Sequence, residues 1–292
     1  MEGRRAVGVR YFDLDQNSHF QPASIVVSSA GSSGTTKLLL MSKSKMFPDG
    51  LGNNSDMVGR CANSHHYTGA FGLFDRDVSS EQGPGATVAF SDLNHMPDKK
   101  IFAGVLCSEF YSLPWAKTQI RPPNSPMWGA EHKKFQRENY RRILRMIGPV
   151  QEIPMYEARI VLHKTKKDAF GMPMLATQGG KHPLTVKQSN IMSDTAKAVL
   201  EEAGAIQTWK INSDPGLGWC NAGGQHQACS CRMGDNPKYS VVDPNCKIWG
   251  TENVFIGDAA VHVNNGGFNP VLTIMALAFR TGSHIAKTFS KA

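Results

Sequence analysis

The sequence contains no long hydrophobic run. Its longest apolar stretches, such as Leu38–Met41 and Val271–Phe279, end well before the roughly 20 apolar residues that a membrane-spanning helix needs. The first residues also lack the apolar core of a signal peptide, because Val7–Phe12 alternates in the manner of a strand. We therefore expect no membrane span, and we expect any export signal to lie outside these 292 residues.

Cysteine is scarce as well. Six cysteines are too few for a disulfide scaffold in a chain of 292 residues, and no two have CxxC spacing. This leaves the redox compartment open. His226, Cys229 and Cys231 are zinc-ligand types, but one intervening residue is not the usual ligand spacing and no second cluster completes four ligands. We expect no metal site.

Acidic residues are outnumbered by basic ones, which gives a formal net charge of +8. The densest basic run shares its stretch with apolar residues, including Phe135, Ile143, Leu144 and Ile147, so it predicts a helix with one solvated face. A basic surface that binds nucleic acid is the alternative. We expect no nucleic-acid partner. The basic residues are Lys133, Lys134, Arg137, Arg141, Arg142 and Arg145.

The N-terminal segment predicts a hairpin over residues 7–27, whose second strand closes in Ile25-Val26-Val27. This strand leads into the small-residue turn Ser28–Gly34, which includes Gly31. The apolar run Leu38–Met41 that follows predicts a helix after the turn. The pattern suits close approach of the backbone to a ligand at the carboxyl end of a strand. A plain tight turn would have the same sequence.

The middle of the chain predicts a mixed or antiparallel sheet with helices. Strands are expected at residues 88–90, 102–106 and 158–162. A helix is expected over Ser189–Ala203, followed by Gly204, the residue type favoured just after a helix end. The whole pattern predicts an α/β fold of the mixed α+β kind.

A carboxylate follows a short, fully apolar strand near the C-terminus. Val254-Phe255-Ile256 enters Gly257-Asp258-Ala259, which places Asp258 where open α/β sheets bind cofactors. Asp258 could hold a ribose or ribityl hydroxyl. An Asp at a strand end is also a common turn former.

The next segment predicts a helix with a well-defined start. Asn269 fits an N-cap and Pro270 the first helical position, and the apolar run Val271–Phe279 predicts a helix that is buried on all sides. Its N-terminus would direct free N–H groups and about half a positive charge into the interior, which suits an anionic group. An ordinary capped core helix is the alternative.

His226 follows Gly223-Gly224 in a predicted loop. Imidazole is the usual base for an alcohol proton near neutral pH, and a glycine-flanked loop lets the side chain face a cleft. A loop histidine on the surface is the alternative.

Taken in order, these segments resemble the C-terminal signature of the glucose–methanol–choline flavoprotein family, at about residues 155–285. That signature has a His-containing run, a Ser-Val-Val-Asp segment, a Gly-Asp-Ala turn, a Gly-Gly-x-Asn-Pro motif and an apolar helix. Here His-Pro-x-Gly-Thr-Cys is replaced by His226–Cys231. The matching segments are 226–234, 240–243, 257–259, 266–270 and 272–278. The likeness to the family continues at 25–40, 50–53 and 58–60, and the segments 167–173 and 203–205 also fit its sugar-acid and polyol branch.

The resemblance implies FAD as cofactor and hydride transfer from a CH–OH group to flavin N5. It makes His226 the base and Asn269 a hydrogen-bond donor to the substrate oxygen. The substrate would be a small alcohol, polyol, sugar or sugar acid, and an electron-accepting partner such as a quinone or cytochrome is expected by analogy. The cofactor-binding residues that it implies are Gly31, Gly257, Asp258, Ala259, Asn269, Pro270 and Thr273.

A complete member of that family opens with a GxGxxG turn that holds the FAD pyrophosphate, and this sequence has none. The resemblance implies a partial FAD-binding domain at residues 1–70, a substrate-binding domain at 71–225 and a return to the FAD-binding domain at 226–292. One hypothesis is a truncated oxidoreductase. The others are a non-catalytic fragment that needs a missing N-terminal half, and a basic binding module.

Overall fold

The computed structural model describes residues 1–79, 82, 85–109, 120–211 and 225–289. The strands are β1 (Gly8–Phe12), β2 (Ser18–Pro22), β3 (Val26–Ser28), β4 (Asn63–Leu73), β5 (Ala86–Phe90), β6 (Leu106–Glu109), β7 (Ile143–Val150), β8 (Arg159–Lys167), β9 (Pro173–Gln178), β10 (Gln207–Lys210), β11 (Gln225–Ala228) and β12 (Val254–Ile256). The α-helices are α1 (Gly31–Met41), α3 (Gly129–Asn139), α4 (Pro183–Glu202) and α5 (Val271–Phe289), and the 3₁₀ turns are η1 (Asp92–Asn94), η2 (Pro97–Lys99) and η3 (Ala259–Val261).

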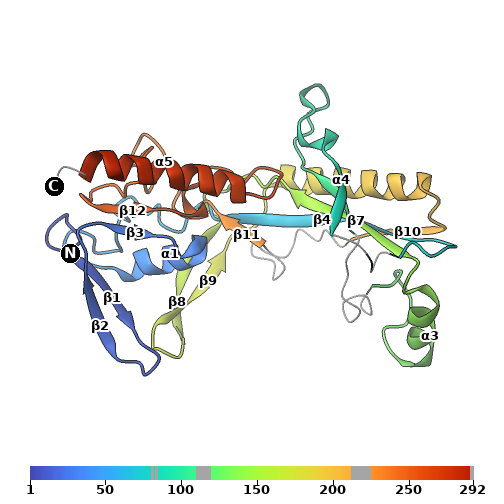
Figure 1. The fold of residues 1–292 in the computed structure, drawn as a ribbon, viewed down its shortest axis with the longest axis horizontal. Coiled ribbons are helices and arrows are strands. Elements are labelled where there is room, and N and C mark those ends of the chain that lie inside the picture. Colours follow the sequence, from blue (N-terminus) through green and yellow to red (C-terminus); the bar gives the residue numbers. More distant parts are fainter. Residues whose placement is uncertain (80–81, 83–84, 110–119, 212–224, 290–292) are drawn as a thin grey trace.

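The molecule is elongated, with α1, α5, β3 and β12 at one end and the larger sheet with α4 at the other (Figure 1). At the first end β3 and β12 pair in parallel, in the register Val26 to Val254. Segments far apart in the sequence thus lie side by side. Leu39 of α1 and Ile256 of β12 belong to the buried apolar cluster between these elements, which fixes α1 against the end of β12.

The predicted hairpin near the N-terminus is shorter than expected. β1 and β2 pair antiparallel from Gly8 opposite Pro22 to Phe12 opposite Ser18, and then the ladder stops. Pro22 has no N–H to extend it. The prediction that the hairpin continues into Val26 and Val27 is wrong, because these residues leave β2 and pair with β12.

The larger sheet has the strand order β10-β4-β7-β6-β5, and β11 also pairs with β4. Helix α4 packs against β4 and β7, where Met192 and Leu200 join a buried cluster with Ala70. The side chain of His182 caps α4 by accepting the Leu184 N–H. The helix therefore begins at Pro183, earlier than the predicted Ser189, while Gly204 follows its end with φ +92°.

Two other sequence expectations for this lobe need correction. The basic stretch is not one helix, because α3 ends at Asn139 and Ile143–Val150 forms β7, paired with both β4 and β6. Cross-strand pairing on both sides outweighs the local helical pattern. The strand expected at residues 102–106 lies further along, as β6 at Leu106–Glu109.

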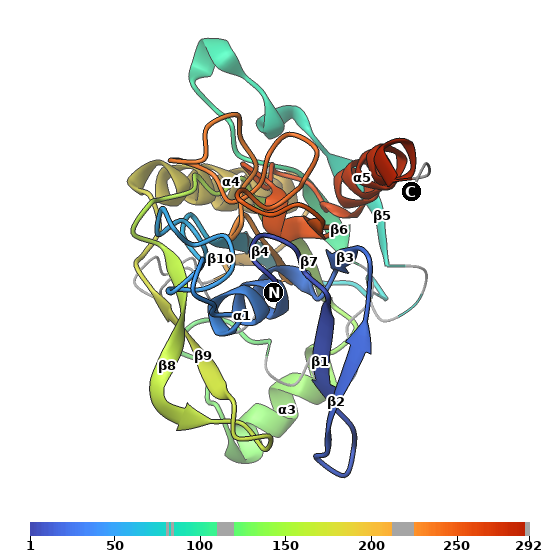
Figure 2. The same ribbon diagram turned by 90° about the vertical axis from the view of Figure 1, so that its left-hand side faces the viewer.

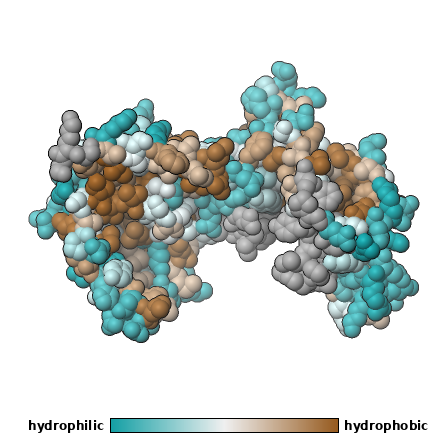
Figure 3. All heavy atoms as spheres, in the orientation of Figure 1, coloured by the Kyte–Doolittle hydropathy of each residue, from teal (hydrophilic) through white to brown (hydrophobic). Residues whose placement is uncertain are grey.

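Helix α5 lies along the outside of its lobe (Figure 2), and the prediction that it is buried on all sides is wrong. Leu272 is 81% exposed and Phe279 74%, and within the helix only Thr281 is buried. Ile274 and Leu277 pack inward, and no described segment covers the opposite side. Figure 3 shows apolar residues gathered on the half of the molecule that carries α5.

Within the described ranges, no helix is both long enough and apolar enough to cross a membrane.

Candidate functional site

Asp258 stands at the end of β12 and links it to α1. Its carboxylate is 9% exposed and accepts hydrogen bonds from the Thr35 hydroxyl at 2.5 Å and the Ala260 N–H at 2.8 Å. Burial raises the pKa of Asp258, while these hydrogen bonds and the Gly31 N–H oppose the rise. Asp258 therefore caps η3 as a turn former does, and its carboxylate lies at the edge of the α1 N-terminus.

A pocket of about 310 Å³ separates the N-terminus of α1 from His226 and Gln227. Ala30, at the N-cap of α1, makes no side-chain cap. Apart from the Gly31 N–H, which bonds Asp258, the first backbone N–H groups of the helix are therefore available to an acceptor. Gly31 has φ +73°, and nothing lies within 4 Å of the place where a Cβ would be. The pocket wall is therefore open to a ligand at this point.

His226 faces the same pocket from β11. Its backbone has φ +67°, which is uncommon for a residue with a side chain, and its carbonyl oxygen accepts a hydrogen bond of 2.6 Å from the Asn265 side chain. Its Nδ1 lies 2.9 Å from His65 Nδ1 and 3.3 Å from the Tyr67 hydroxyl. Burial lowers the pKa of His226, so the ring is neutral near pH 7 and able to accept a proton.

His65 is a site residue that the sequence pattern did not predict. It lies on β4, 1% exposed, and its Nε2 contacts the Gly266 carbonyl oxygen at 2.9 Å and that of Asn265 at 3.2 Å. Burial lowers its pKa to about 4. The available signal was a run of polar residues, Asn63–His66, in a strand that is buried along most of its length.

The remaining predicted residues lie around this centre. Ala259 is buried and accepts the Cys229 N–H through its carbonyl oxygen, while a Cβ at Gly257 would lie 2.8 Å from the Ser29 hydroxyl. The loop that leads into α5 borders the histidine pair through the Gly266 carbonyl oxygen. Gly223 and Gly224 lie outside the described residues.

Asn269 and Thr273 are exposed. Helix α5 begins at Val271, and the Ile274 N–H donates to the Pro270 carbonyl oxygen. Pro270 thus precedes the first helical residue instead of occupying it, a difference of one position.

Cys229 and Cys231 are both buried. Burial raises the pKa of both thiols, that of Cys231 to about 12, so neither is a thiolate near neutral pH. In the part of the chain that the structure describes, no three His, Cys, Asp or Glu side chains are grouped to hold a metal ion.

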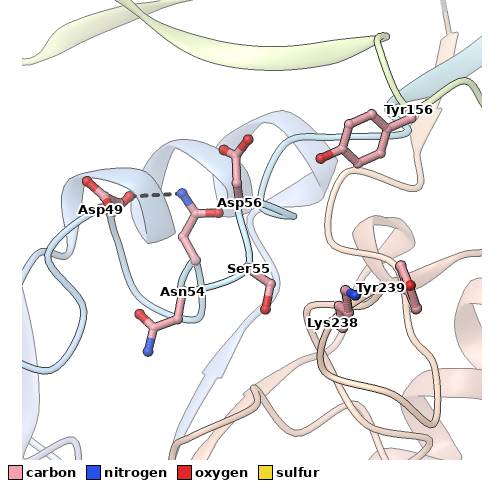
Figure 4. Close-up of a pocket in the computed structure, with 8 residues that line it drawn as sticks. Asp49, Asn54, Ser55, Asp56, Tyr156, Lys238 and Tyr239 are labelled. Carbon is pink, nitrogen blue, oxygen red and sulfur yellow. Dashed lines mark hydrogen bonds between the residues drawn. The ribbon is translucent and has the colours of Figure 1, made fainter.

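A second pocket, of about 620 Å³, shares no residue with the first (Figure 4). Asp56, on its wall, is bound by Arg159 at 2.9 Å and by Arg60, and the Arg60 guanidinium lies 4.0 Å from the Tyr156 ring centre. The Asp56 carboxylate is thus paired within the protein, and the residues that line the pocket include no histidine. The pocket beside His226 is the better candidate for chemistry.

Two solved oxidase structures share this fold. The chain superposes on pyridoxine 4-oxidase from Mesorbium loti with a TM-score of 0.62 at 14% identity, covering 100% of this chain and 56% of that one. It superposes on formate oxidase from Aspergillus oryzae with a TM-score of 0.58 at 14% identity, covering 99% and 59%. The fold is therefore that of one large part of these oxidases.

The sequence comparisons give the family. Residues 156–278 match the model of the GMC oxidoreductase C-terminal domain. The chain is 29% identical to a 2-methyl-1,2-propanediol dehydrogenase of Mycolicibacterium austroafricanum, over 98% of this chain and 52% of that enzyme. It is 27% identical to the fructose dehydrogenase large subunit of Gluconobacter japonicus, over 96% and 50%.

The family model and the curated relatives support the glucose–methanol–choline oxidoreductase family, with this chain matching its C-terminal half. It spans about half the length of the curated relatives that it matches. Members of this family depend on FAD, and the relatives named above include enzymes that act on a diol and on a sugar.

Proposed function

We propose that this chain forms the substrate-activating part of an FAD-dependent oxidoreductase that acts on the CH–OH group of a small alcohol, polyol, sugar or sugar acid. One observation carries the proposal: Asn265 and His65 hold His226 at the wall of a pocket that the α1 N-terminus closes, where burial lowers the pKa of the imidazole. A neutral imidazole fixed beside a cavity is what general-base removal of a hydroxyl proton needs.

Several groups in the chain suit one side of an FAD molecule. Gly31 leaves room for close approach, and Asp258 and Ala259, after β12, would line the ribityl and phosphate side together with Gly257. Pro270 and Thr273, at the start of α5, would place the positive end of the helix near the ring. When bound, FAD would supply the acceptor for the hydride that leaves the substrate carbon.

The side chains then divide the remaining work. His226 takes the hydroxyl proton of the substrate, and Asn269, on the loop before α5, hydrogen-bonds the substrate oxygen. The α1 N-terminus keeps its N–H groups toward the pocket. We also propose the division into a partial FAD-binding domain at 1–70, a substrate-binding domain at 71–225 and the C-terminal return at 226–292.

A second candidate follows from α5. Leu272, Met275 and Phe279 are more than half exposed on one helix, and such a continuous apolar face on a soluble protein marks an interaction surface. We infer that a further polypeptide segment, one that carries a pyrophosphate-binding glycine-rich strand, covers α5 before FAD binds tightly. On this view the chain by itself is a non-catalytic fragment.

The visible absorption spectrum separates these candidates. The purified chain is incubated with excess FAD, freed of unbound cofactor, and compared with a fusion in which the N-terminal half of the diol dehydrogenase relative precedes it. We expect the chain alone to be colourless and the fusion to retain flavin bands and to oxidise polyols with an artificial electron acceptor. Flavin bands on the chain alone would overturn the requirement for another segment.

The role of His226 is tested in the same fusion. His226→Ala removes the base but none of the groups assigned to the cofactor, so turnover should fall by roughly 100-fold or more while the flavin bands remain. Unchanged turnover in the flavin-loaded variant would exclude His226 as the base.

A further inference from the structure

The buried His65 faces the half-buried His226 at the wall of the pocket. His65 Nδ1 lies 2.9 Å from His226 Nδ1, and the two ring planes stand at 87° with their centres 5.0 Å apart. The distance is that of a hydrogen bond. One proton must therefore lie between the two nitrogens, and the neighbouring groups decide which nitrogen carries it.

The contacts of the other ring nitrogen, Nε2, determine the tautomer of His65. Nε2 contacts only carbonyl oxygens, of Gly266 at 2.9 Å and Asn265 at 3.2 Å, and a carbonyl oxygen can only accept. Nε2 of His65 therefore carries a hydrogen. Because burial keeps this ring neutral, with a pKa of about 4, its Nδ1 has a lone pair and no hydrogen.

The hydrogen in the contact between the rings then belongs to His226. Its Nδ1–H donates to His65 Nδ1, and its own Nε2 keeps the lone pair that a base requires. We propose that His65 is a positioning residue that fixes His226 in the Nδ1–H tautomer and thereby leaves Nε2 free to accept the substrate proton. The catalytic meaning of this proposal rests on the proposed function, whereas the tautomer does not.

Tyr67 is the competing partner. Its hydroxyl lies 3.3 Å from the same Nδ1 and, by donating to it, would favour the opposite tautomer. In that arrangement two lone pairs would face each other across 2.9 Å between the histidines, which is repulsive. The shorter contact with His65 therefore determines the tautomer of His226. The Tyr67 hydroxyl then accepts a weak hydrogen bond from the His226 Nδ1–H or bonds another group.

The same contact assists the base after it has reacted. Once Nε2 has taken the proton, the ring of His226 is a cation, and its Nδ1–H bond to His65 becomes charge-assisted and stronger. His65 thus stabilises the protonated form of His226 without contacting the substrate.

The test uses two replacements of similar size. The side-chain oxygen of Asn lies near the place of Nδ1, so His65→Asn keeps the acceptor for His226. The amide of Gln reaches the place of Nε2, so His65→Gln keeps the contact with the Gly266 carbonyl oxygen and loses that acceptor. Thermal unfolding of both variants confirms that they are folded.

Nitrogen-15 NMR of histidine-labelled full chain reads the tautomer directly, with His226→Gln identifying the His226 signals. We expect the wild type, His65→Asn and Tyr67→Phe to show the Nδ1–H form of His226. His65→Gln should shift it to the Nε2–H form. A wild type that is mainly Nε2–H, or a His65→Gln variant that keeps the Nδ1–H form, would overturn the proposal.

Kinetics in the flavin-loaded fusion supply the second readout. His65→Gln should lower kcat by about 100-fold, the order expected when a catalytic group is misplaced, with little change in KM, and His65→Asn should recover most of the loss. Equal loss in both variants would show a structural role only. Failure of the fusion to retain flavin would contradict the proposed function and leave the NMR result for His65 intact.

Discussion

At the scale of single residues, burial of histidine makes the stability of this chain depend on pH. His66, beside His65 on β4, is 6% exposed, and burial together with the nearby Lys181 lowers its pKa from 6.5 to about 4. The unfolded chain therefore takes up a proton first as the pH falls, so this stability is complete above about pH 6.5 and is lost as the pH falls toward 4.

Because of His66, we expect the unfolding free energy to fall by about 2 kcal/mol when the pH is lowered from 7 to 5. Urea denaturation of wild type and His66→Gln across this range measures the effect, and the variant should have the shallower slope. His95→Gln, at an exposed position, serves as the control. Parallel curves for wild type and His66→Gln would contradict the assignment.

A matched pair of glycines tests how backbone geometry holds the site together. Gly59 has φ +88°, and a Cβ there would lie 2.2 Å from the Ile160 carbonyl oxygen, whereas Gly31 has a similar φ and open space around it. Gly31→Ala should lower the unfolding free energy by about 1–2 kcal/mol, the cost of placing an alanine in the left-handed backbone conformation. Gly59→Ala should cost about 1–3 kcal/mol more, because the backbone around β8 must move.

Chemical denaturation of the two alanine variants compares these costs in the absence of cofactor. Equal midpoints for Gly59→Ala and Gly31→Ala would contradict the contact with Ile160.

At the scale of elements, α5 should contribute to stability through its inner side only. Leu272→Ser and Phe279→Ser alter side chains that are 81% and 74% exposed, so each should change the unfolding free energy by less than about 0.5 kcal/mol. Leu39→Ala, at a position 1% exposed in α1, should cost about 2–5 kcal/mol.

The exposed side should be evident in binding measurements. An apolar fluorescent dye should bind the wild-type chain, and Leu272→Ser combined with Phe279→Ser should weaken that binding without changing the melting temperature. A loss of stability in the double variant would show that the outer side of α5 is packed in solution.

At the scale of the whole molecule, the positive charge should not make this chain a nucleic-acid binder. Arg141 and Arg142 contact Asp77 at 3.4 and 3.8 Å, and Lys210 contacts Asp194 at 2.6 Å. Two arginines of the densest basic run are thus paired with a carboxylate instead of presenting free charge to a phosphate backbone. We expect a flat titration with duplex DNA at low salt, and saturable binding that weakens as salt increases would support the basic binding module.

The features that could be predicted from sequence are those that local chemistry fixes. The turn at Gly31, the buried strand Val254–Ile256 and the carboxylate that follows it were predicted, because each depends on a few adjacent residues. The family assignment was confirmed, since it rests on motifs in order along the chain.

The misses depend on contacts that local pattern does not specify. The apolar run of α5 led to the prediction that the helix is buried on all sides. Burial requires a partner surface, however, and no described segment covers Leu272 or Phe279. The residues of β7 were assigned to a helix because their two neighbouring strands are distant in sequence. His65 was missed because its partner, His226, is 161 positions away.

The pairing of β3 with β12 has a consequence for how the chain is made. Asn253, just before β12, donates to the Ala6 carbonyl oxygen across 247 positions of sequence. Such long-range pairing is slow, because loop closure costs entropy before the contact stabilises anything. On the ribosome, β3 and the N-terminus of α1 must wait until β12 has been synthesised. Until then the strand β12 is missing from the site, and the apolar sides of β3 and α1 that pack against it stay exposed to solvent. Chaperones bind exposed apolar surfaces of this kind.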